Sequence, residues 1–170
     1  MTTASPTTRP AGYGVSQIAL HWIIAALVFF QLVFGESMGK IGWMTRRGET
    51  PSATDYLMAN LHIYAGVAIL VLALIRLYVR IKQGVPAAPA GGNPMLKKIA
   101  AGMHHLFYLL LIVVPVTGLV AEYLYRPAGE IHELAKPVFI VLIAVHAAAA
   151  LYHQFVVKDG VLMRMLKPGA

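Results

Sequence analysis

The chain has 170 residues, of which 58% are hydrophobic and only 12% are charged, against about 25% charged residues in an average soluble domain. It contains no cysteine, which excludes disulfides, iron–sulfur clusters and haem attached through thioethers. The net charge is +7, and the basic residues behind it lie at the ends of apolar segments. This placement is typical of membrane proteins and not of nucleic-acid-binding proteins.

Four long apolar segments dominate the chain. Residues 1–16, rich in Thr, Pro and Ala, are expected to form a flexible leader, since they lack the n-region and cleavage site of a signal peptide. The apolar segments contain no Asp, Glu, Lys or Arg and cover residues 17–35, 57–75, 99–121 and 137–157. Because about 20 apolar residues cross the hydrocarbon core, we predict an all-α integral membrane four-helix bundle over residues 17–157.

The connections set the orientation. We expect a long loop of mixed charge at 36–56, a Pro/Gly loop at 84–94 and a tight turn at 126–133. Four crossings put both termini on one side, with the basic residues Arg9, Arg80, Lys82, Lys97, Lys98, Lys158, Arg164 and Lys167. The other side has Lys40, Arg46, Arg47, Arg126 and Lys136. This bias predicts cytoplasmic termini, a cytoplasmic tail at 158–170, and an outer interface marked by Trp43, Tyr56, Tyr123 and Tyr125.

Histidines are the most informative residues of the sequence. His132 lies just before the fourth apolar segment, and the others lie within the segments: His21, His62, His104, His105, His146 and His153. Ionisable groups inside a membrane are costly and usually face the bundle interior. A hydrogen bond to a neighbouring helix would explain any single one of them, so only their joint spacing indicates a function.

A 14-residue interval recurs on all four helices. It separates His132 from His146, which corresponds to a rise of about 21 Å along one helix. The same interval joins His21 to Gly35, His62 to Arg76, and His104 to Gly118. Two haems stacked across a membrane need ligands at two such depths, and glycine admits the edge of a flat porphyrin.

Depth along the helices assigns the partners. His21 and His146 are expected to meet near the cytoplasmic side, and His62 and His132 near the outer side. Two imidazoles on each iron leave no open position for O₂, which favours electron transfer. Two alternatives stay open: Pro137 can kink the fourth helix, and His132, flanked by glutamates, can be a solvated loop residue.

The remaining polar residues suggest further contacts at the cytoplasmic side. Arg76, inside the second helix, needs an anion such as a haem propionate. His153 is expected beside Arg76 and other basic residues, where it would serve a quinone head group or a propionate. His104 has the same two candidate roles. Snorkelling to the interface explains His104 and His153 equally well, and for His105 it is the preferred interpretation.

At these residues the sequence resembles the bacterial cytochrome b561 family. The resemblance covers about residues 13–167 and depends on YGVSQIALHW in the first helix, NLHIYAGVAILVLALIRL in the second, HHLFYLLLIVVPVTGL in the third and HAAAALYHQFVVKDGVLMRM in the fourth. It implies that the first, second and fourth helices hold two b haems. Carried onto this sequence, the ligands are His21 with His146 and His62 with His132.

Within that family the pattern is most similar to the superoxide oxidase type. This implies electron transfer from periplasmic superoxide to ubiquinone, in the bacterial inner membrane. The basic residues of the outer side would steer such an anion, although ordinary solvated charge explains each of them equally well. The loops depart from that type: the connection before His132 is shorter and the first outer loop is longer, which leaves the electron donor open.

Two other functions remain compatible with the sequence. The chain can be a haem-bearing membrane anchor that exchanges electrons with a periplasmic partner protein, since another branch of the family is paired with small periplasmic lipid-binding proteins. It can also be a haem-free transporter or proton channel that uses buried histidines. The second alternative does not explain why the histidines recur at two depths.

Overall fold

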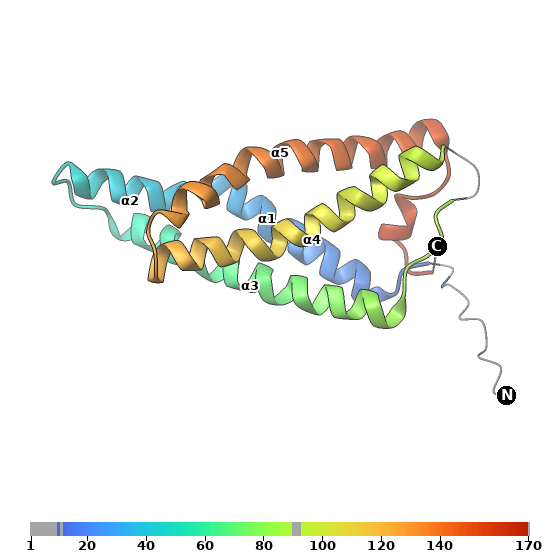
Figure 1. Ribbon diagram of the computed structural model, residues 1–170, viewed down its shortest axis with the longest axis horizontal. Helices are drawn as coiled ribbons and strands as arrows, with labels where there is room; N and C mark the ends of the chain where they lie inside the picture. The colour runs from blue at the N-terminus through green and yellow to red at the C-terminus, as the bar shows by residue number, and fades with distance from the viewer. Residues whose placement is uncertain (1–9, 11, 90–92, 170) are drawn as a thin grey trace.

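The fold is a bundle of four long helices (Figure 1). The computed structural model describes residues 10, 12–89 and 93–169; residues 1–9 and 11 of the expected leader, and 90–92 of the expected loop, lie outside them. The long helices are α1 (Val15–Phe34), α3 (Ala53–Gln83), α4 (Pro94–Tyr123) and α5 (Ala128–Tyr152). A short helix, α2 (Ser37–Arg46), follows α1 and extends past the ends of the others (Figure 1). The prediction of an all-α fold with four helices long and apolar enough to span a membrane is confirmed.

Helix caps explain why α3 and α4 begin before their apolar segments. Ser52 and Asp55 form a capping box: Ser52 Oγ accepts from the Asp55 N–H at 3.2 Å, and Asp55 Oδ2 accepts from the Ser52 N–H at 2.9 Å. Asn93 caps α4 by accepting from the Met95 N–H at 2.8 Å. These polar first turns lie outside any apolar segment, so hydropathy alone does not find them.

Two loop predictions are wrong because part of each expected loop is helical. The segment 36–56, predicted as a loop, contains α2. This helix is short and mixes polar with apolar residues, so hydropathy does not identify it as a membrane span. The turn at 126–133 is shorter than predicted, because α5 already begins at Ala128. His132 is therefore a half-buried helical residue and not a solvated loop residue. Pro137 lies inside α5 without ending it.

The buried core lies in the middle of the bundle. Only 11–17% of the residues in the most apolar windows of the four spans are buried, so most apolar side chains face outward, as lipid contact requires. The core cluster consists of Ile24, Val28, Ile69, Ala73, Leu111, Ala135 and Phe139. On every helix these residues lie between the two positions joined by the 14-residue interval. An apolar layer therefore separates the two ends of the bundle.

The C-terminal segment folds back onto the bundle. After α5 the chain forms a π-helical turn (His153–Val157) and returns toward the start of α1. Trp22 Nε1 donates a hydrogen bond to the Met165 carbonyl at 2.7 Å, and the Gly169 N–H donates to the Tyr13 carbonyl at 3.2 Å. Both described ends of the chain therefore lie at one end of the bundle, called the terminal end below. The opposite end, where α2 lies, is called the distal end.

Candidate functional site

The distal end brings together one predicted histidine pair. His62 of α3 and His132 of α5 have ring centres 5.8 Å apart and planes inclined at 84°. His132 Nδ1 donates a hydrogen bond to the Val114 carbonyl of α4 at 2.9 Å. Because a carbonyl only accepts, this bond assigns the proton to Nδ1 and leaves Nε2 as a free electron-pair donor. Metal-binding histidines are commonly oriented in this way.

Two glycines let the distal rings approach the neighbouring helices. A Cβ on Gly118 of α4 would lie 2.9 Å from Cε1 and 3.0 Å from Nδ1 of His132. A Cβ on Gly35, just after α1, would lie 3.2 Å from Nδ1 of His62. The glycines of the 14-residue interval thus lie against imidazole rings. That they admit a porphyrin edge stays a prediction.

Three histidine rings lie close together at the terminal end. His21 of α1 and His146 of α5 have ring centres 6.3 Å apart and planes inclined at 56°. His104 of α4 lies nearer to His146 than His21 does, with the two rings perpendicular and their centres 5.5 Å apart. Phe107 contacts the same ring at 5.5 Å. His104 is exposed and donates from Nδ1 to the Ala100 carbonyl at 2.7 Å, whereas His21 and His146 are half-buried. Burial therefore favours His21 as the partner of His146.

The two sites lie at different depths on one continuous helix. Because α5 runs unbroken from Ala128 to Tyr152, a rise of 1.5 Å per residue separates His132 from His146 by about 21 Å. The apolar core fills the layer between them. Each end of the bundle therefore has its own histidine pair, and a layer of apolar side chains lies between the pairs.

A cationic cleft lies at the terminal end. Arg76 Nε donates to Tyr108 Oη at 3.1 Å, and the Arg80 guanidinium lies 5.8 Å from the centre of the same ring. Tyr13 and Gln17 complete the lining of this small cleft. Within the described part of the chain neither arginine has a carboxylate partner, and a half-buried guanidinium favours an anion such as a propionate.

His153 has a partner that the sequence analysis missed. Its Nδ1 donates to Asp159 Oδ2 at 2.6 Å, so it faces an acidic residue where basic neighbours were predicted. Burial alone would raise the pKa of Asp159, but the hydrogen bonds from His153 and from the Val161 N–H lower it, and the net direction is down. The π-helical turn that begins at His153 is a feature often found at functional sites.

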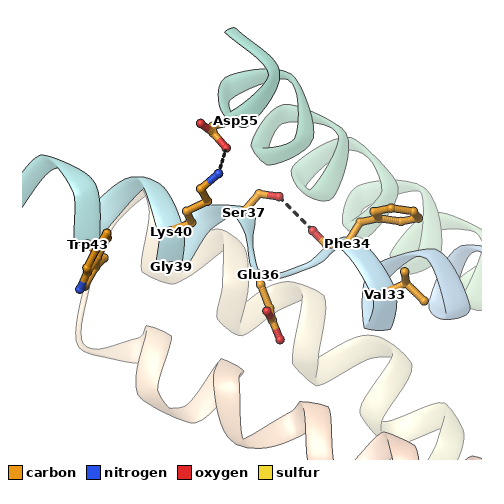
Figure 2. Close-up of a pocket in the computed structure, with 8 residues that line it drawn as sticks. All are labelled: Val33, Phe34, Glu36, Ser37, Gly39, Lys40, Trp43 and Asp55. Carbon is orange, nitrogen blue, oxygen red and sulfur yellow. Dashed lines mark hydrogen bonds and ion pairs between the residues drawn. The ribbon is translucent and has the colours of Figure 1, made fainter. Parts of the chain in front are cut away.

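The distal end is less positive than the number of its basic residues suggests. A hollow of about 520 Å³ lies where α1 meets α2, beside the start of α3 (Figure 2). Lys40 forms an ion pair with Asp55 across it at 2.6 Å, and Lys136 of α5 pairs with Glu36. Arg47 pairs with a neighbouring glutamate. Three of the five basic residues predicted to steer an anion are thus neutralised locally, which weakens the field at this face.

The histidine pairs have the chemistry to hold b haem, because each pair could supply two imidazole nitrogens to an iron. Imidazole nitrogens bind a metal ion such as zinc at about 2 Å, so two of them on opposite sides of one ion lie about 4 Å apart, with their ring centres farther apart. Ring-centre separations of 5.8 Å and 6.3 Å match this arrangement. The free Nε2 of His132 supplies a donor atom at the distal end, and the cleft at Arg76 suits a propionate at the terminal end.

A helical membrane bundle with paired histidines at two depths defines a membrane cytochrome. The chain belongs to the prokaryotic cytochrome b561 family, whose pattern it matches over residues 12–168. Family membership implies haem b and electron transfer across the membrane.

Several relatives align over nearly the whole chain. Cytochrome b562 of Cereibacter sphaeroides is 40% identical over 162 residues, which cover 95% of this chain and 99% of that protein. The probable superoxide oxidase CybB of Yersinia pestis is 29% identical over 178 residues, covering 91% and 95%. Cytochrome b561 homolog 1 of Escherichia coli is 28% identical over 176 residues, covering 91% and 96%.

Sequence reasoning missed two residues that form hydrogen bonds with histidines, Gln31 and Asp159. Gln31 of α1 donates from Nε2 to the His62 carbonyl at 2.9 Å, and its polar side chain inside an apolar segment was the available signal. Asp159 lies two residues after the fourth segment and gave no pattern of its own. His105, by contrast, is exposed and donates to the carbonyl of Ala101 at 2.8 Å, as an interface residue can.

Proposed function

We propose that the chain transfers electrons across the bilayer through two b haems, one held by His62 and His132 and the other by His21 and His146. The observation that carries this proposal is the presence of a histidine pair at each end of one bundle. A b haem held by two imidazoles supplies one-electron chemistry at an iron that has no open position for a substrate.

The surrounding residues have distinct roles in this proposal. The Val114 carbonyl and Gly118 orient His132 so that its Nε2 is available. The apolar core keeps water out of the layer between the two levels. Arg76 balances negative charge at the terminal level, with Tyr108 holding its guanidinium in place.

We place the distal end outside the cytoplasm and the quinone site at the terminal end. Lys and Arg are more numerous around the terminal end, which supports this orientation. Reduction of ubiquinone there consumes two electrons and two protons. The pair of His153 and Asp159 can hold and release a proton at that end, which supports a role in the quinone site.

Superoxide is the proposed donor at the distal face. Two superoxide ions would each lose one electron and leave as O₂, and with two protons one ubiquinone would become ubiquinol. Support comes from the relative in Yersinia pestis named as a probable superoxide oxidase. The second candidate donor is a periplasmic protein, favoured by the projecting helix α2 and by the local pairing of Lys40, Lys136 and Arg47.

Haem stoichiometry tests the core of the proposal. We expect two b haems per chain from a reduced-minus-oxidised spectrum with pyridine-haem quantitation, and one in each of His62→Ala and His21→Ala. A colourless protein after adequate haem supply would refute it. Rapid ubiquinone reduction by superoxide with the purified chain would identify the small-molecule donor, whereas reduction that requires a co-purified protein would identify the partner.

A further inference from the structure

The two distal histidines differ in one respect. His132 has an acceptor for its Nδ1–H in the Val114 carbonyl. His62 Nδ1 is buried and has no hydrogen-bond partner among the described residues. A buried polar atom without a hydrogen-bond partner costs free energy and calls for an explanation.

An unused acceptor lies on the helix beside His62. Gln31 Oε1 is also buried and without a partner in the part of the chain that the structure describes. The amide of Gln31 is already in contact with His62, because its Nε2 donates to the His62 carbonyl at 2.9 Å. Gly66 faces this amide at van der Waals distance, with 3.4 Å between a Cβ built there and Nε2. The imidazole itself lies over Gly35, one helical turn after Gln31.

We propose that Gln31 is a positioning residue for His62, with Oε1 accepting the Nδ1–H when Nε2 binds iron. A carboxamide can donate from Nε2 and accept at Oε1 simultaneously. Gln31 therefore holds both the backbone and the ring of His62, as the Val114 carbonyl holds the ring of His132. The inference depends on the proposed haem at His62 and His132.

Such a bond changes the electronic properties of the ligand as well as its orientation. Accepting the Nδ1–H makes the imidazole more basic, and a more basic ligand stabilises ferric over ferrous iron. Removal of the acceptor should therefore raise the midpoint potential of the distal haem, and a stronger acceptor should lower it. A residue that served only to pack α1 against α3 would alter stability without this opposite response.

The test is a redox titration, monitored by absorbance and EPR, of the haem-loaded wild type, Gln31→Leu and Gln31→Glu. Gln154→Leu is the matched control, because Gln154 Oε1 is equally buried and unpartnered but lies at the terminal end. We expect Gln31→Leu to shift the distal potential upward, Gln31→Glu to shift it downward, and Gln154→Leu to leave it unchanged. His62→Ala identifies which of the two potentials is distal.

Each other outcome overturns the inference. Two haems with an unchanged distal potential in Gln31→Leu would mean that the backbone carbonyl of Gln31, or no group, accepts from His62. If Gln31→Leu fails to fold, an unchanged potential in Gln31→Glu has the same meaning. A His62→Ala variant that retains both haems would refute the proposed function, and the inference with it.

Discussion

Replacement of Gly118 by alanine tests whether a close fit between α4 and His132 holds the distal haem. The added Cβ would lie 2.9 Å from Cε1 and 3.0 Å from Nδ1 of the imidazole, so the ring must move. Overpacking of this kind costs about 1–3 kcal/mol. Movement also weakens the hydrogen bond to Val114, worth about 0.5–1.5 kcal/mol. Loss of such support typically reduces metal affinity by about 10- to 100-fold.

The assay follows haem transfer from the purified protein to an excess of a haem-scavenging apoprotein. We expect one of the two haems to leave Gly118→Ala faster than it leaves the wild type, and the haem-to-chain ratio to fall toward one. Gly102→Ala is the control, because it lies on the same helix and its added Cβ would meet no atom within 4 Å. Two haems that leave Gly118→Ala at the wild-type rate would refute the reasoning.

Three further predictions concern the terminal end. His104→Ala should retain both haems while His21→Ala loses one, as pyridine-haem quantitation would show; the reverse result would make His104 the ligand. Because the pKa of Asp159 lies below its ordinary value of 3.8, its pairing with His153 should contribute stability above about that pH and lose it as the pH falls further. Thermal unfolding of the wild type should therefore become more acid-sensitive than that of Asp159→Asn, and equal sensitivity would count against the pair. Trp22→Phe removes one hydrogen bond worth about 0.5–1.5 kcal/mol and should speed proteolysis of the C-terminal segment, with no change in haem content.

The pairing of histidines could be predicted because a membrane constrains depth. A span of about 20 residues has a known rise, so residue number along each apolar segment translates directly into depth. The structure brings His62 to His132 and His21 to His146, the pairs that depth alone predicted. Their roles as ligands remain predictions for the haem measurements to test.

The polar segments were harder to predict. Helix α2 and the first turns of α5 are set by backbone hydrogen bonds and local packing, which an apolar run does not report. Lys40 and Lys136 form ion pairs with residues that lie 15 and 100 positions away in the sequence. A count of basic residues therefore overstated the positive charge of the distal face.

The sequence by itself determined four helices long and apolar enough to span a membrane, and the depth of the histidines within their apolar segments, because hydropathy and helical rise are properties of a single segment. That His132 is helical was decided by the structure. Only the tertiary structure decided which groups surround each ring, because the rotation of a helix about its axis depends on its neighbours. It assigned Gly118 to the ring of His132 and placed His104 as well as His21 beside His146. It also set Gln31 against His62, a contact between two helices that no spacing within either helix encodes.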